Sequence, residues 1–175
     1  MLKGVGIEDI NEEYSVEKVD LDLKAKFREF WKTKLFDDER KENQGNNLRR
    51  YRDFKTIFEM ETYLTHITEF NECKALTKLR VSNHNLIIEK GRHQRLPIER
   101  RLCNKCNVIE NEEHFLTQCE KNKNLRDKLY EEIIKDCHHF SNLEPKEKMI
   151  YMLSQTDEAI MRHIGKFVDS SFKLI

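Results

Sequence analysis

Apolar residues recur at spacings of three and four along most of the chain, which is the period of an amphipathic helix. The first stripe runs through Val16, Val19, Leu23, Phe27, Phe30, Trp31 and Leu35, with Ser15 available as its N-cap. Later stripes predict helices over 48–58, 60–67, 71–80, 125–134, 145–153 and 156–168. We interpret the aromatic residues of these stripes as core. With only five Gly and two Pro, the pattern predicts a mainly α fold with short connections.

Breaks in this pattern divide the 175 residues into three regions. Residues 1–47 read as an N-terminal amphipathic helix followed by a polar linker over 37–47. Residues 48–140 read as a helical region with a basic arm, in which Gly91 ends a helix, and with a small embedded zinc knuckle at 97–119. Residues 141–175 read as C-terminal helices. This length fits one medium domain or two small ones.

The amino-acid composition indicates in which cellular compartment we expect the protein. Charged residues make up 37% of the chain, and no run of 18 apolar residues or apolar signal core occurs, so we expect a soluble protein that neither enters a membrane nor is secreted. The five cysteines are an odd number with a metal-type cluster, which favours a reducing compartment. We therefore expect an intracellular protein, nuclear or cytoplasmic.

Charge is balanced over the whole chain, with 32 basic and 32 acidic residues, but not locally. Between Lys74 and Lys105 there are nine Lys/Arg and two acids, whereas residues 107–120 hold four acids and no Lys/Arg. Such a basic arm is typical of phosphate binding. A solvated face of mixed sign explains the same counts equally well.

A cysteine and histidine cluster carries the most specific chemistry. Cys103 and Cys106 are separated by two residues, His114 follows after seven more, and Cys119 after another four. Three thiolates and one imidazole are the ligand set of a closed, structural Zn²⁺ site with no position for a catalytic water. A disulfide, reduced structural thiols and coincidence are the alternatives.

The residues around the second ligand pair predict local structure. Asn111 can cap a helix whose first turn holds Glu112 and Glu113. His114 and Cys119 are five residues apart, or about 140° around an ideal helix, so both cannot face one metal from it. We expect this helix to end or unwind at Cys119 and a new one to begin near 122–124.

The stretch from about Trp31 to Tyr130 resembles the C-terminal region of reverse transcriptases from LINE-type (non-LTR) retrotransposons. The matching residues are Leu79-Arg80-Val81-Ser82-Asn83-His84, Glu89-Lys90-Gly91-Arg92, Pro97, Glu99-Arg100, Cys103, Cys106, Glu112-Glu113-His114-Phe115-Leu116 and Cys119, with the basic-aromatic run 49–55 upstream. The resemblance implies a structural zinc site at Cys103, Cys106, His114 and Cys119. It also implies a module that helps to hold template RNA or target DNA, with the polymerase domain of the same element as a further partner.

The resemblance does not extend to catalysis. The chain lacks a Tyr followed by the paired aspartates of the polymerase motif, and it lacks the Pro-Asp signature of the associated endonuclease. A nucleophile drawn from Cys73 or Cys137 with one of the seven histidines has no supporting motif, and the HExxH metalloprotease spacing is absent. We therefore predict a protein that is not an enzyme. With these motifs missing, the resemblance implies a fragment, a decayed copy or a stand-alone gene derived from such an element.

Nucleic-acid binding is the leading hypothesis for function. The residues predicted to contact phosphates are Arg80, Lys90, Arg92, Arg95, Arg100 and Arg101. The choice between RNA and DNA, the sequence preference and the oligomeric state stay open. The alternative is a zinc-stapled helical module that binds a protein through apolar helix faces, with Trp31 and Phe36 as candidate contacts.

Overall fold

The computed structural model describes residues 16–36, 48, 50–55 and 58–174. It divides into two units, Met1–Gly45 and Asn46–Ile175. The predicted mainly helical fold is confirmed: the described residues form helices and no strand, with one isolated antiparallel bridge between Leu102 and Ile109. The predicted cap at Ser15 and the predicted linker over 37–47 lie outside the described residues.

The first unit contains helix α1, Val16–Phe36, as the apolar stripe predicts. The interpretation of its aromatic residues as core was wrong. Phe27 is 62% exposed, Phe30 52% and Trp31 45%. A helical stripe becomes core only against a second apolar element, which the described residues of this unit do not supply.

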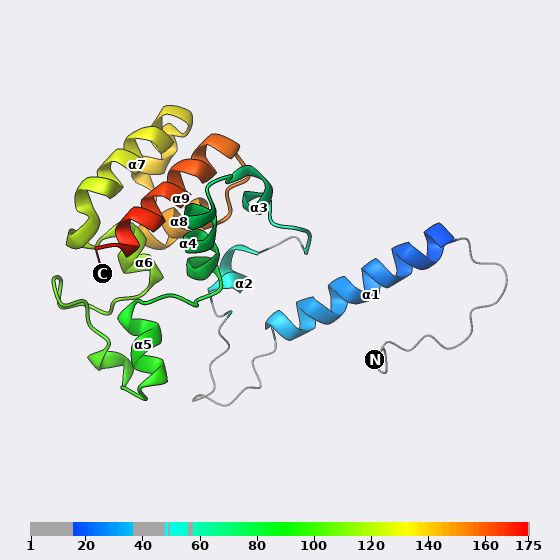
Figure 1. Cartoon of the computed structure of the whole chain (residues 1–175), viewed down its shortest axis with the longest axis horizontal. Coiled ribbons are helices and arrows are strands. Elements are labelled where there is room, and N and C mark those ends of the chain that lie inside the picture. Colours follow the sequence, from blue (N-terminus) through cyan, green and yellow to red (C-terminus); the bar gives the residue numbers. More distant parts are fainter. Residues whose placement is uncertain (1–15, 37–47, 49, 56–57, 175) are drawn as a thin grey trace. The chain divides into compact units, whose positions relative to one another are not determined.

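The second unit is a cluster of short helices (Figure 1). The α-helices are α2 Tyr51–Phe54, α3 Tyr63–His66, α4 Phe70–Arg80, α5 Ile87–His93, α6 Glu112–Thr117, α7 Lys123–Asp136, α8 Pro145–Leu153 and α9 Glu158–Phe172. Short 3₁₀ turns are η1 Ile98–Arg100, η2 Glu120–Asn122 and η3 His138–Asn142.

Helix α9 organises the core of the second unit, because it packs against α3, α4 and α7 (Figure 1). The predicted start of this helix is confirmed, since the Asp157 side chain accepts a hydrogen bond of 2.9 Å from the Ile160 amide. Ile164, Phe167 and Val168 are buried along its inner face. The core combines residues of 48–140 with residues of 141–175, among them Leu79, Phe115, Leu116, Ile133, Phe140, Met149 and Ile164.

Helix α5 ends later than predicted. It continues through Gly91 to His93, so Gly91 does not end it. Gly91 serves a close approach instead: a Cβ atom there would lie 2.6 Å from Cγ of Arg101. The Arg101 guanidinium then donates to the carbonyls of Leu96 and Ile88, at 2.7–3.1 Å, and fixes the chain that leads into the first cysteine pair.

Candidate metal centre

The first cysteine pair lies in a turn closed by the Leu102–Ile109 bridge. The Cys103 amide donates to the Val108 carbonyl at 2.7 Å, and the Asn107 amide donates to the Cys103 carbonyl at 2.8 Å. Asn107 has a φ of 55°, the left-handed conformation that asparagine tolerates better than most residues. The local backbone therefore brings the Cys103 and Cys106 side chains to one side of a tight loop.

The second pair is positioned by the end of α6. Asn111 caps this helix as predicted, accepting a hydrogen bond of 2.8 Å from the His114 amide. Helix α6 ends at Thr117, and the Cys119 amide donates back to the His114 carbonyl at 2.8 Å. The next α-helix begins at Lys123. The predicted break between the two ligands is thus confirmed, and it is this break that turns Cys119 toward His114.

The four side chains converge. One ligand atom from each of Cys103, Cys106, His114 and Cys119 lies within 4.8 Å of the others. The Cys103 and Cys119 sulfurs are 3.8 Å apart. Sulfur ligands of a tetrahedral Zn²⁺, each about 2.3 Å from the metal, lie roughly 3.8 Å from each other. All five cysteines are free thiols, which excludes the disulfide alternative in this structure. The cluster is close enough to hold a metal ion.

The protonation chemistry of the buried ligands also fits a metal. Neither ring nitrogen of His114 has a hydrogen-bond partner, although both are buried. An unpartnered buried polar atom costs roughly 1–3 kcal/mol unless something binds it. Burial lowers the pKa of His114, which favours the neutral imidazole that binds metals. Burial raises the pKa of the Cys119 thiol to about 12, with neighbouring Cys103 adding to the effect, so a thiolate there needs a cation beside it.

Residues outside the predicted set support this cluster. Arg126, which is buried on α7, donates to the Cys119 carbonyl at 2.6 Å. Lys121 forms an ion pair of 2.8 Å with the buried Glu110. The Glu120 amide donates to the Cys106 sulfur at 3.3 Å. Sequence reasoning missed Arg126 and Lys121, because their only signal is proximity in sequence to Cys119.

Glu110 and Glu112 tie the cluster to the rest of the second unit. Glu110 accepts from the Ile87 amide at 2.8 Å and so anchors the start of α5. Glu112, fully buried on α6, accepts from the Ser82 hydroxyl at 3.0 Å and lies 3.1 Å from His84 Nε2. The motif residues around Ser82 and those around His114 are therefore in contact in the fold.

The six predicted phosphate contacts fall into two groups. Arg80 is 5% exposed, and it pairs with Glu61 at 2.6 Å. Arg101 is half-buried and donates to backbone carbonyls, as described above. The guanidinium groups of these two residues are therefore held by the protein. Whether either contacts a phosphate stays a prediction.

The other four lie on α5 and the turns after it. Arg92 is half-buried and pairs with Glu89 at 2.7 Å. Lys90, Arg95 and Arg100 are exposed, and no ion pair of theirs occurs within the described part of the chain. Figure 1 shows α5 at the lower edge of the helical cluster.

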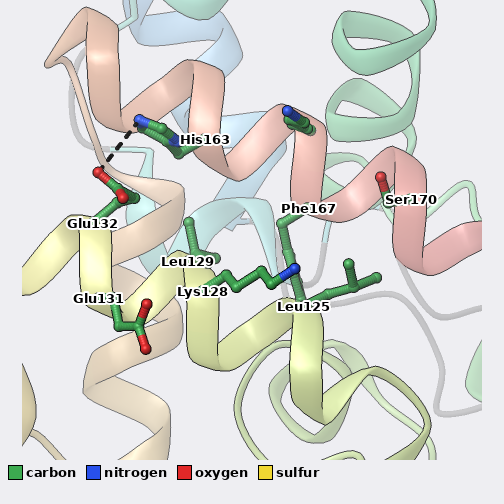
Figure 2. Close-up of a pocket in the computed structure, with 9 residues that line it drawn as sticks. Leu125, Lys128, Leu129, Glu131, Glu132, His163, Phe167 and Ser170 are labelled. Carbon is green, nitrogen blue, oxygen red and sulfur yellow. Dashed lines mark ion pairs between the residues drawn. The ribbon is translucent and has the colours of Figure 1, made fainter.

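A surface cavity of about 270 Å³ lies elsewhere, between α7 and α9 (Figure 2). Leu125, Leu129 and Phe167 line it together with polar side chains, among which His163 Nε2 lies 4.0 Å from Oε2 of Glu132. None of its lining residues is a predicted metal ligand or phosphate contact.

Comparisons with known proteins identify no relative: no family model, no curated protein and no solved structure matches this chain. The resemblance to LINE-type reverse transcriptases therefore stays a prediction, which depends on the motif residues alone. No helix among the described residues is both long and apolar enough to cross a membrane.

Proposed function

We propose that this chain is a zinc-binding, nucleic-acid-binding module without catalytic activity, comparable to the C-terminal region of a LINE-type reverse transcriptase. The convergence of Cys103, Cys106, His114 and Cys119 is the observation that carries the proposal. Three thiols with one imidazole suit Zn²⁺ better than Mg²⁺ or Ca²⁺, which prefer oxygen ligands. A four-ligand site of this kind holds backbone in place and leaves no position for a reacting water.

The exposed charge near this site supports a polyanionic partner. Two of the acids counted between residues 107 and 120 are buried: Glu110 pairs with Lys121, and Glu112 lies against His84 and Arg50. Their charges are compensated inside the protein. Lys90, Arg95, Arg100 and Lys105 are exposed, so four cations of the arm and the knuckle face solvent, where a phosphate can reach them.

The decisive experiment is the salt dependence of binding. We would measure affinity for single-stranded RNA, duplex DNA and an RNA–DNA hybrid across a range of salt, for wild type and for a Lys90→Gln, Arg95→Gln, Arg100→Gln variant. If these cations contact phosphates, the slope of log affinity against log salt falls by roughly 2–3, at about 0.7–0.9 per contact. The matched control is Lys128→Gln, Lys146→Gln, Lys166→Gln, which removes three exposed lysines elsewhere in the unit.

Zinc content must be equal in all three proteins, so that a changed slope reflects lost cations and not a lost fold. Equal slopes in the variant and the control would overturn the assignment of the cations. Absence of binding by wild type at low salt would overturn nucleic-acid binding itself. Apolar docking to a protein partner, in contrast, is nearly insensitive to salt.

A further inference from the structure

The aromatic side chains of α1 form one exposed cluster. Phe27 and Trp31 have ring centroids 6.0 Å apart with planes at 69°, and Phe30 and Trp31 have centroids 5.7 Å apart at 81°. The large aromatic side chains classed as exposed within the described residues are these three and Phe70. Three of the four therefore gather within five residues. Exposed apolar clusters of this kind mark interaction sites.

The charges around this cluster select the partner. Residues 24–36 contain five cations, Lys24, Lys26, Arg28, Lys32 and Lys34, and a single acid, Glu29. Lys34 Nζ lies 5.8 Å from the centre of the Phe30 ring. The first part of the helix is different, since residues 16–23 hold three acids and one lysine. Net positive charge thus accompanies the rings, whereas the part of the helix without rings carries net negative charge, and Lys24 pairs with Asp20 at 2.5 Å between the two parts.

We propose that α1 binds single-stranded nucleic acid, with bases stacked on Phe27, Phe30 and Trp31 and with phosphates beside the surrounding cations. Proteins commonly bind unpaired bases with aromatic side chains that are surrounded by cations. The faces of unpaired bases are free to stack on these rings, whereas in a duplex they stack on neighbouring bases. The inference builds on the proposed nucleic-acid binding, but it depends on a different unit from the basic arm.

An anionic bilayer fits α1 less well. A helix that lies on an anionic membrane interface needs cations along its polar face. The first part of α1 instead carries Glu17, Asp20 and Asp22, which anionic lipids repel.

Trp31 provides a local probe, because it is the only tryptophan of the chain. We would titrate the full-length protein with a 20-nucleotide oligothymidylate and with the same length of duplex, and follow Trp31 emission. Stacking should quench the emission with the single strand and leave it nearly unchanged with the duplex. The key variant is Phe27→Leu, Phe30→Leu, which keeps apolar side chains and removes two rings. It should weaken single-strand binding roughly tenfold or more.

The matched control is Phe70→Leu, an exposed aromatic of the second unit, which should bind as wild type does. Circular dichroism checks that helix content is unchanged. Four results would overturn the proposal: no quenching by the single strand, equal affinity of the Phe27→Leu, Phe30→Leu variant, a response to phosphatidylserine vesicles in place of the single strand, or a response to protein concentration alone. The last two would assign the cluster to a membrane or to a second copy.

The Lys90→Gln, Arg95→Gln, Arg100→Gln variant separates this inference from the proposed function. Trp31 quenching that persists in that variant supports stacking on α1, whatever becomes of the basic arm. If that variant loses affinity for the single strand but Trp31 emission does not respond in wild type, the proposed function is supported and the inference about α1 is wrong.

Discussion

Arginine side chains of the same basic region have two different roles in this protein. The Arg80 guanidinium lies over the rings of Phe54 and Tyr63, at 4.6 and 4.9 Å from their centres, and donates to the Leu153 carbonyl. We expect Arg80→Ala to lower the free energy of unfolding by roughly 3 kcal/mol, because it leaves Glu61 short of a partner and opens a gap among the rings. Urea unfolding followed by circular dichroism measures this change.

Arg100→Ala is the control for that measurement. Its side chain is exposed, so the substitution should change stability by no more than about 0.5 kcal/mol. Equal effects of the two substitutions would mean that the Arg80 contacts contribute nothing.

Glu61 should make stability depend on pH. Burial alone raises its pKa, but hydrogen bonds from Lys55 and Tyr51 and the charge of Arg80 outweigh that effect and lower it. Ionised Glu61 therefore stabilises the fold fully above its ordinary pKa of 4.5, and this contribution is lost as the pH falls through the lower, folded value. We expect Glu61→Gln to lose stability at pH 7 and to show a flatter decline in stability below about pH 4.5 than wild type. Thermal unfolding from pH 7 to pH 3 tests this, and an unchanged slope would contradict it.

Sequence could not separate buried from exposed cations. Arg80 and Arg95 look alike in a linear count, since each lies among other basic residues. The difference comes from partners distant in the chain, such as Glu61 and Leu153 for Arg80. The cluster of Cys103, Cys106, His114 and Cys119 was predictable for the opposite reason: its spacing is local, and thiol and imidazole groups have few other reasons to cluster.

At the scale of elements, most helices were predictable from periodicity and caps, whereas tight contacts between elements were not. Gly91 is the clearest case. On propensity alone, Gly91→Ala should stabilise α5 by about 1 kcal/mol. Because the added Cβ would meet Cγ of Arg101, we expect it to destabilise the protein by about 1–3 kcal/mol.

A double-mutant cycle decides between these effects. In an Arg101→Ala background the obstructing atoms are gone, and Gly91→Ala should then be neutral or stabilising. The measurement is the free energy of unfolding of all four proteins. A similar loss with and without the Arg101 side chain would show that the contact is not the cause.

Metal binding should order one half of the candidate centre more than the other. Between Leu102 and Ile109 only Cys103 is buried, whereas α6 is anchored by the buried Phe115 and Leu116. We expect one Zn²⁺ per chain, lost in Cys103→Ser, Cys106→Ser and kept in Cys73→Ser, Cys137→Ser. Chelation should increase hydrogen exchange over 102–110 while the α6 amides stay protected. Full zinc in the first variant would refute the ligand assignment.

At the scale of the whole molecule, two units are joined in one chain, and each is proposed to bind nucleic acid. Both segments were visible in the sequence. The aromatic residues of α1 were interpreted as core, because an amphipathic stripe does not reveal whether a second apolar element packs against it. If both units bind one strand, a 30-nucleotide single strand should bind on the order of 10²-fold more tightly than a 6-nucleotide one, beyond the gain expected from extra register positions. Fluorescence anisotropy gives the two affinities.

Substitutions in either unit should reduce this dependence of affinity on strand length. Most of the length effect should disappear in either of two variants, while the intact unit still binds the 6-nucleotide strand. One variant is Phe27→Leu, Phe30→Leu, and the other is Lys90→Gln, Arg95→Gln, Arg100→Gln. Combining both sets should then abolish the remaining binding, because no second contact is left to raise the effective concentration of strand. A length effect of the same size in wild type and in both variants would mean that the two units do not share a strand. In that case each unit would act on its own ligand.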